Sequence, residues 1–204
     1  LGTAGFTAAL SLYRLQQNDV TQESGKVVIT GATGGVASLA ISMLKRLKYH
    51  VVAITGKDSE HEYLKSLGAD EILPRSAVDL TSTRPLEKAQ WAAAFDSVGG
   101  ATLAWLTRTM QQNGVIASFG NAGGVELNTT VLPFILRGVR LIGIDSAATE
   151  MHLRQEIWHR LANEWRPQHL DKLAHTVAFE LLPEVLPKML SAHTHGRTVI
   201  KISG

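Results

Sequence analysis

The residues best suited to chemistry lie in a glycine-rich stretch that follows the apolar run 27–29. This stretch contains Gly31, Gly34 and Gly35, whose missing Cβ atoms let the backbone turn sharply and approach a ligand closely. After Gly35 the apolar residues recur at helical spacing. A strand that leads through such a turn into a helix leaves backbone N–H groups and the positive helix end pointing at one spot. The pattern predicts an anion site that fits a pyrophosphate.

The glycine spacing by itself leaves a second interpretation open. Ala32 and Ala37 stand where the dinucleotide-binding pattern G-x-G-x-x-G has its first and last glycines. Alanine is tolerated at the last position, where the helix packs on the strand. A tight strand-to-helix turn that binds no ligand would show the same residues.

The end of the second expected strand indicates which dinucleotide would bind. An acid at this place holds the ribose hydroxyls of NAD, whereas a lysine or arginine attracts the 2′-phosphate of NADP. Here Thr55, Gly56 and Lys57 offer a hydroxyl, an N–H and a positive charge, and Arg75 follows the next strand. Asp58 is the counter-argument, and we interpret it as an acid near a helix N-terminus. We therefore predict NADP(H), with a solvated surface lysine as the alternative for Lys57.

Alternating strand and helix patterns predict the elements that position these residues. Strands are expected at 27–29, 50–55, 71–73, 91–96, 114–120 and 139–145, and helices at 2–15, 35–48, 60–67, 101–110 and 131–137. This alternation predicts an α/β fold with a doubly wound, mostly parallel (Rossmann) sheet, in which ligands bind beyond the carboxyl ends of the strands. Ser59 and Glu62 have the spacing of a capping box for the helix at 60–67, and Gly68 is expected to end it.

The composition excludes several classes of protein. With 45% hydrophobic and 19% charged residues, the 204-residue chain is typical of a globular protein. The net charge is only +2 and no basic run occurs, so nucleic-acid binding is not favoured. No apolar run approaches the roughly 20 residues that span a membrane. The absence of cysteine excludes cysteine-ligated zinc and fits a reducing compartment, so we expect a cytoplasmic protein.

The pattern changes at Thr149, where a C-terminal extension begins. A long amphipathic helix is expected at 151–165, followed by a strand at 175–179, a helix at 183–190 and a strand at 198–202. These elements do not continue a simple doubly wound sheet, and they are typical of a segment that returns to a neighbouring domain. We therefore divide the chain into an NADP-binding domain, residues 1–148, and an extension, residues 149–204.

Several stretches together point to one family. They read G-T-A-G-F-T-A at 2–8, T-G-A-T-G-G-V at 30–36, Y-L-K-S-L-G-A at 63–69, R-P-L-E-K at 84–88, D-S-V-G at 96–99, T-T-V-L-P-F-I-L-R-G at 129–138 and G-I-D-S at 143–146. The first three resemble the cofactor domain of the medium-chain dehydrogenases/reductases. The others are similar to its zinc-independent quinone reductases and, within these, to the acryloyl-CoA reductase branch. The tail matches more loosely, through Gly196-Arg197.

The resemblance implies an NADPH-dependent oxidoreductase that transfers a hydride to an activated C=C bond of acryloyl-CoA or a related short enoyl-CoA. An NADPH:quinone reductase is the alternative enzyme, and a non-catalytic NADP-binding module or fragment is the alternative of another class. It also implies a barrel-like catalytic domain before Leu1, so that this chain alone would be incomplete for catalysis. The expected partners are a small-molecule substrate and a second copy, joined in a homodimer through residues 139–144.

The same resemblance implies the cofactor-binding positions. They are Thr33, Gly34, Gly35 and Val36 for the pyrophosphate; Thr55, Gly56, Lys57 and Arg75 for the 2′-phosphate; Val98 along the adenine ribose and nicotinamide path; Asn121 and Ser146 at the nicotinamide end; and Ile135 as an apolar wall. Asn121 departs from the family, in which an apolar residue is common. The reaction needs a proton donor, and the sequence assigns none. No metal is expected, because His193 and His195 have no acid near them and are interpreted as an exposed loop.

Overall fold

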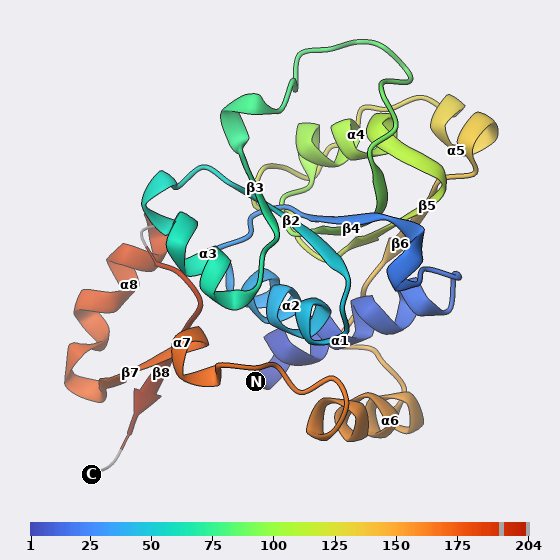
Figure 1. Cartoon of the computed structure of the whole chain (residues 1–204). Coiled ribbons are helices and arrows are strands. Elements are labelled where there is room, and N and C mark those ends of the chain that lie inside the picture. Colours follow the sequence, from blue (N-terminus) through green and yellow to red (C-terminus); the bar gives the residue numbers. More distant parts are fainter. Residues whose placement is uncertain (192–193, 203–204) are drawn as a thin grey trace.

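The computed structural model of the chain describes residues 1–191 and 194–202. Its centre is a six-stranded sheet in the order β3-β2-β1-β4-β5-β6, in which each neighbouring pair runs parallel (Figure 1). The strands are β1 (Lys26–Ile29), β2 (His50–Thr55), β3 (Glu71–Pro74), β4 (Trp91–Asp96), β5 (Met110–Ser118) and β6 (Arg140–Gly143). The strand order reverses between β1 and β4, which confirms the predicted doubly wound fold.

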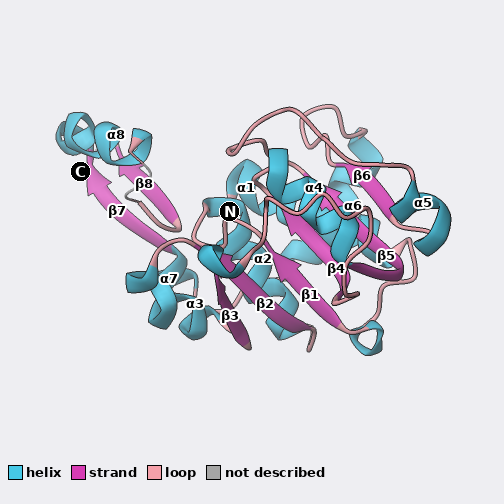
Figure 2. Ribbon diagram, turned by 90° about the horizontal axis from the view of Figure 1, so that it is seen from above, coloured by secondary structure: helices cyan, strands magenta, loops and turns pink. Residues whose placement is uncertain are grey.

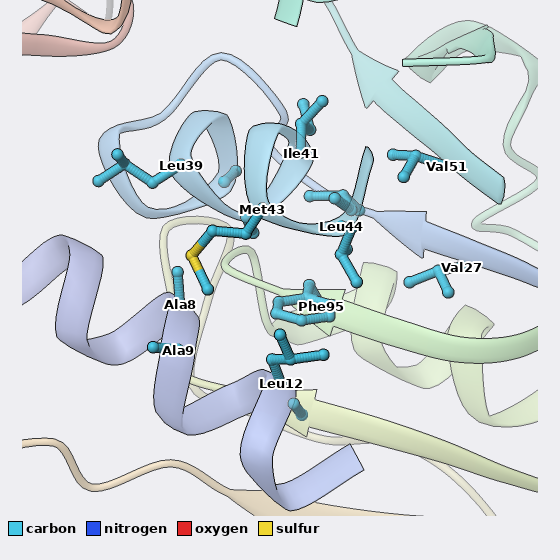
Figure 3. Close-up of a cluster of buried hydrophobic side chains, with 14 of the residues drawn as sticks. Ala8, Ala9, Leu12, Val27, Leu39, Ile41, Met43, Leu44, Val51 and Phe95 are labelled. Atoms are coloured by element: carbon cyan, nitrogen blue, oxygen red, sulfur yellow. The ribbon is translucent and has the colours of Figure 1, made fainter. Parts of the chain in front are cut away.

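Helices cover both faces of this sheet. One face packs on α1 (Gly2–Gln16), α2 (Gly35–Arg46), α3 (His61–Leu67) and α6 (Met151–Ala162), and the other on α4 (Gly100–Thr109) and α5 (Leu132–Arg137). Val27 and Ile29 of β1 enter the first core and Val28 enters the second, as the alternation of side chains along a strand requires. Figure 3 shows Leu12 of α1 and Leu44 of α2 beside Phe95 of β4 in the first core.

Short helical turns lie between the longer elements of the chain. They are η1 (Gln22–Ser24), η2 (Asp58–Glu60), η3 (Arg75–Ala77), α7 (Leu170–Leu173) and η4 (Phe179–Leu181). No helix among the described residues is long and apolar enough to cross a membrane.

The predicted capping box at the start of α3 is wrong. The backbone N–H of Glu60 bonds to the carbonyl of Lys57 at 3.1 Å and so forms the 3-10 turn η2. Ser59 therefore lies inside that turn, and α3 begins only at His61, with Glu60 at the N-cap and no side-chain cap bond. The end of the helix is as predicted, because Gly68 adopts a left-handed conformation with φ of +112°.

The C-terminal strands form a sheet of their own. β7 (Ala174–Ala178) and β8 (Arg197–Lys201) pair in parallel, with α8 (Leu182–Leu190) between them in the chain, and this part stands to one side of the central sheet (Figure 2). Its apolar side chains are largely uncovered, since Leu190 is 90% exposed and Ile202 83%. A surface of this kind favours the expectation that the extension packs on a neighbouring domain.

The first part of the extension differs from its C-terminal strands. Ile157 and Leu161 of α6, Trp165 after that helix and Leu173 of α7 are buried in the first core together with residues of α1 and α2. The division at residue 148 stays a prediction about domains, and the hydrophobic core continues past it to Leu173.

Candidate functional site

A cavity of about 700 Å³ opens where β1, β2, β4 and β5 end. Its lining consists of Thr30, Gly31, Thr33, Gly34, Gly35, Val36, Ala37, Ile54, Thr55, Gly56, Lys57, Arg75, Val78, Leu80, Ser97, Val98, Thr102, Phe119, Gly120, Ala122, Gly123 and Thr194. The position agrees with the rule that ligands of such sheets bind beyond the carboxyl ends of the strands, at the point where the strand order reverses.

Most of the cofactor-binding positions expected from the sequence meet in this cavity. Those that line it are Thr33, Gly34, Gly35, Val36, Thr55, Gly56, Lys57, Arg75 and Val98. Asn121 is exposed between Gly120 and Ala122, which both line the cavity. The structure does not bring Ile135 or Ser146 into the lining. Ile135 lies on α5 and is 70% exposed, and Ser146 is half-buried beyond β6.

The glycine turn between β1 and α2 is built for close approach. Gly31 has a φ of +57°, and a Cβ on it would collide with the hydroxyl of Ser97. Gly34 is the N-cap of α2 and has no side chain to bond the first N–H groups of the helix. These N–H groups and the positive end of the α2 dipole therefore remain for an anion at the cavity.

A buried carboxylate joins the two central strands under the cavity. Asp96, which is fully buried, accepts a hydrogen bond of 2.7 Å from the hydroxyl of Thr30 and one of 3.0 Å from the N–H of Gly99. Ser97 completes the link, because its hydroxyl donates to the carbonyl of Thr30 at 2.9 Å. The network fixes the end of β1 against the end of β4. Sequence analysis assigned no role to Thr30.

Burial raises the pKa of Asp96 above its ordinary value of 3.8, and the hydrogen bond from Thr30 only partly offsets this. When the folded pKa is the higher one, the carboxyl stabilises the protein most below the unfolded pKa and less as the pH rises through the folded pKa. We expect the stability of the wild type relative to Asp96→Asn to be greatest below about pH 4 and to fall as the pH rises. Urea unfolding at several pH values measures it, and a difference that grows with pH would contradict the raised pKa.

Two basic side chains stand at the β2 end of the cavity. The N–H of Lys57 donates to the Thr55 hydroxyl at 3.0 Å, and its Nζ donates to the carbonyl of Thr194 at 2.7 Å. The Arg75 guanidinium lies against Gly56, where a Cβ would be 3.0 Å from its Cζ. The side chain of Asp58 is 89% exposed and is not part of the lining. This end of the cavity is therefore suited to a second anionic group.

A segment from the far end of the chain crosses the glycine turn. The N–H of Gly196 donates to the carbonyl of Thr33 at 2.9 Å. Arg197 lies so close to Gly35 that a Cβ there would be 2.8 Å from its Cδ. This places a third cation beside the N-terminus of α2. Sequence analysis noted Gly196-Arg197 only as a loose family match, because nothing local indicates which turn it meets.

The loop after β3 contributes an apolar wall that sequence analysis also missed. Val78 and Leu80 line the cavity. Arg108 of α4 anchors this loop, because its Nε lies 2.8 Å from Oε1 of Glu87, and the two side chains are only 10% and 19% exposed. Arg108 also donates to the carbonyl of Asp79 at 3.4 Å. The sequence signal for this wall was the presence of two apolar residues, Val78 and Leu80, in a largely polar loop.

The histidines expected to form an exposed loop are only partly described. His193 lies outside the described residues. For His195 the expectation that no acid lies nearby is wrong, because its Nδ1 lies 3.0 Å from Oε2 of Glu60. Its side chain is 42% exposed, and its ring contacts that of Tyr63 with centroids 4.4 Å apart. Within residues 1–191 and 194–202, no group of three or more histidine, aspartate or glutamate side chains is placed to hold a metal.

Comparison with known proteins agrees with this geometry. Residues 35–163 match the family model described as zinc-binding dehydrogenase. Over 203 residues, covering all of this chain and 62% of the other, the chain is 42% identical to "Probable acrylyl-CoA reductase AcuI" of Escherichia coli (strain K12). Over 202 residues, covering 98% of this chain and 61% of the other, it is 45% identical to "Putative quinone oxidoreductase YhfP" of Bacillus subtilis (strain 168).

Solved structures show the same arrangement. The yhdH oxidoreductase from Salmonella enterica, in complex with NADP, superposes with a TM-score of 0.94 at 42% identity, over 99% of this chain and 62% of that one. The Bacillus subtilis protein yhfP, with NAD bound, superposes with a TM-score of 0.94 at 44% identity, over 98% of this chain and 61% of that one. The chain thus spans about six-tenths of the length of the relatives that it matches.

Proposed function

We propose that this chain, which belongs to the zinc-binding dehydrogenase family and within it to the zinc-independent acryloyl-CoA reductase branch, is the NADP(H)-binding part of a reductase. The proposed reaction is hydride transfer from NADPH to an activated C=C bond, with acryloyl-CoA or a related short enoyl-CoA as substrate. The observation that carries the proposal is the cavity at the glycine turn, with Lys57 and Arg75 at its β2 end.

The residues of the cavity fit NADP(H) at two separate places. The glycine turn and the N-terminus of α2 offer N–H groups to the pyrophosphate, where a side chain on Gly35 would press against Arg197. Lys57 and Arg75 offer positive charge to the 2′-phosphate, which is the group that distinguishes NADP from NAD. The Salmonella relative was solved with NADP and the Bacillus relative with NAD, so the basic pair is our reason for proposing NADP(H).

The protein's own residues would bind and orient the cofactor. When bound, NADPH supplies the hydride. Val98 lines the cavity, and we assign it to the adenine ribose and nicotinamide path. Asn121, Ile135 and Ser146 remain our proposals for the nicotinamide end, and the last two lie beyond the cavity lining. We assign the proton donor to no residue of this chain.

An assay of the full-length protein tests the reaction. We expect NADPH to be oxidised in the presence of acryloyl-CoA, with quinones as poorer acceptors. Oxidation with quinones but not with acryloyl-CoA would instead support the quinone reductase that the name of the Bacillus relative suggests. NADPH binding without oxidation by either acceptor would favour a non-catalytic NADP-binding module.

Arg197 provides a separate prediction about the pyrophosphate. Because this group is common to NADPH and NADH, we expect Arg197→Ala to weaken both cofactors by a similar factor of roughly 10, as for the loss of one charge-assisted hydrogen bond. Isothermal titration of the two cofactors measures the two factors. Arg166 is exposed and outside the cavity lining, as Arg197 is, but it follows α6 instead of lying against Gly35, so it provides the matched Arg→Ala control. A loss confined to NADPH would place Arg197 at the 2′-phosphate instead.

We also propose that two copies associate through the β6 edge of the sheet and that the protein works in the cytoplasm. β6 ends the strand order and pairs only with β5 in the six-stranded sheet. Val131 and Leu136, at the neighbouring helix α5, are 63% and 55% exposed. Light scattering of the full-length protein tests the dimer, and a monomer at micromolar concentration would contradict it.

A further inference from the structure

The turn that follows β2 carries charges of both signs. Lys57 precedes the 3-10 turn η2, which contains the acids Asp58 and Glu60. An acid at this place repels a 2′-phosphate and favours NAD. A site that is to prefer NADP must therefore offset these carboxylates as well as supply a cation.

Each of the two acids has a histidine as its partner. Oε2 of Glu60 lies 3.0 Å from Nδ1 of His195, and the Glu60 side chain is only 20% exposed. Oδ1 of Asp58 lies 3.7 Å from Nε2 of His61, and its side chain is 89% exposed. The Asp58 charge is therefore screened by water, whereas the partly buried Glu60 depends on His195.

His195 also fixes the segment that reaches Lys57. Its ring contacts the Tyr63 ring of α3, with centroids 4.4 Å apart. The preceding residue, Thr194, accepts the hydrogen bond from Lys57 Nζ at 2.7 Å through its carbonyl. An ammonium group has three N–H donors, so this bond holds Lys57 in place and leaves donors for a phosphate.

We propose that the Glu60–His195 pair is a positioning and specificity device that sets the preference of this site for NADPH over NADH. The pair offsets the charge of Glu60, whose N–H bonds to the carbonyl of Lys57, and holds the carbonyl of Thr194 against the Lys57 side chain. The inference rests on the proposed binding of NADP(H). It concerns two residues, Glu60 and His195, that do not line the cavity and would act through Lys57. It predicts that the preference depends on the charge of His195.

The groups around His195 set the charge balance of the pair. The titratable and charged groups in its surroundings are Glu60 from η2, Tyr63 from α3 and His175 from β7, with Lys57 linked through Thr194 and Arg197 two residues after His195 in the chain. Glu60 is the acid in contact with it. A protonated His195 cancels the charge of Glu60, whereas a neutral hydrogen-bond donor at position 195 leaves that charge in place.

The test compares the dissociation constants of NADPH and NADH for the full-length protein and its variants at pH 6. Glutamine at position 195 can still donate a hydrogen bond to Glu60 and has no charge. At pH 6 we expect His195→Gln to lower the ratio of the NADH dissociation constant to the NADPH dissociation constant by about three- to fivefold. This factor corresponds to the usual contribution of a partly exposed ion pair.

Two further variants separate charge from structure. Adding Glu60→Gln to His195→Gln removes the unpaired acid, so the ratio should return towards that of the wild type. His152→Gln is the matched control, because His152 lies 3.3 Å from Glu150 in an exposed pair on the far helix α6 and should leave the ratio unchanged.

The outcomes distinguish this inference from the proposed function. An unchanged ratio in His195→Gln at pH 6, or a double variant no better than His195→Gln, would overturn the specificity role while wild-type NADPH binding stands. A wild type that shows no preference for NADPH would overturn the proposed cofactor and this inference with it.

Discussion

Replacing Lys57 with alanine should weaken NADPH binding by about 10- to 100-fold and leave NADH binding within about twofold of the wild type. The reason is that the Lys57 ammonium is placed to make charge-assisted hydrogen bonds to the 2′-phosphate, each contributing roughly 1.5–3 kcal/mol. NADH lacks this phosphate and therefore loses nothing specific. Fluorescence titration of both cofactors gives the two ratios.

The matched control for this variant is Lys65→Ala. Lys65 lies on α3 with a side chain that is 61% exposed, and its ion pair with Glu62 at 3.2 Å is a surface contact. We expect its removal to leave both affinities unchanged. If Lys57→Ala bound NADPH as tightly as the wild type, Lys57 would be an ordinary surface lysine and the 2′-phosphate would have to lie elsewhere.

The second large effect concerns stability. Trp165→Ala should lower the free energy of unfolding by about 3–5 kcal/mol, the usual cost of deleting a large aromatic side chain from a core. Trp165 is only 2% exposed, belongs to the core that α1 and α2 form with the sheet, and has the Arg160 guanidinium 4.8 Å from its ring centroid. Urea unfolding of the chain measures the loss.

Trp158→Ala is the control for this prediction. Trp158 lies on α6, which ends three residues before Trp165, and it stacks on Phe6 at 5.9 Å but is 38% exposed. Its removal should cost roughly 1 kcal/mol, because water already reaches much of the ring. Equal losses for the two variants would contradict the assignment of Trp165 to the main core. The predicted result implies that a fragment ending at residue 148 would be unstable.

The sequence predicted the central sheet well because its signals are local. The β-branched run at 27–29, the glycines that follow and the apolar spacing after Gly35 each describe a few neighbouring residues, and β1 and α2 form there. The capping box at Ser59 failed for an equally local reason. The Glu60 N–H bonds to the carbonyl of Lys57 and forms a 3-10 turn. Ser59 lies inside this turn and therefore cannot be the N-cap of the helix.

The parts of the site that the sequence did not predict depend on distant contacts. Gly196 bonds to Thr33, and Thr194 bonds to Lys57, across more than half of the chain. No spacing rule connects positions so far apart. Thr30 is similar, since a threonine at the end of a strand gains its role only from Asp96 on the adjacent strand. A single sequence contains the residues of such contacts but not their pairing.

The central claim is that the cavity at the glycine turn binds NADP(H) through its pyrophosphate and its 2′-phosphate. The most direct measurement is an NMR titration of the isotopically labelled chain with NADPH and, separately, with NADH. The account predicts saturable shifts of the backbone amides of Gly34, Gly35 and Val36 with both cofactors, and of Gly56 and Lys57 with NADPH alone. Saturable shifts that lie elsewhere, or the absence of any shift at these amides with NADPH, would contradict it.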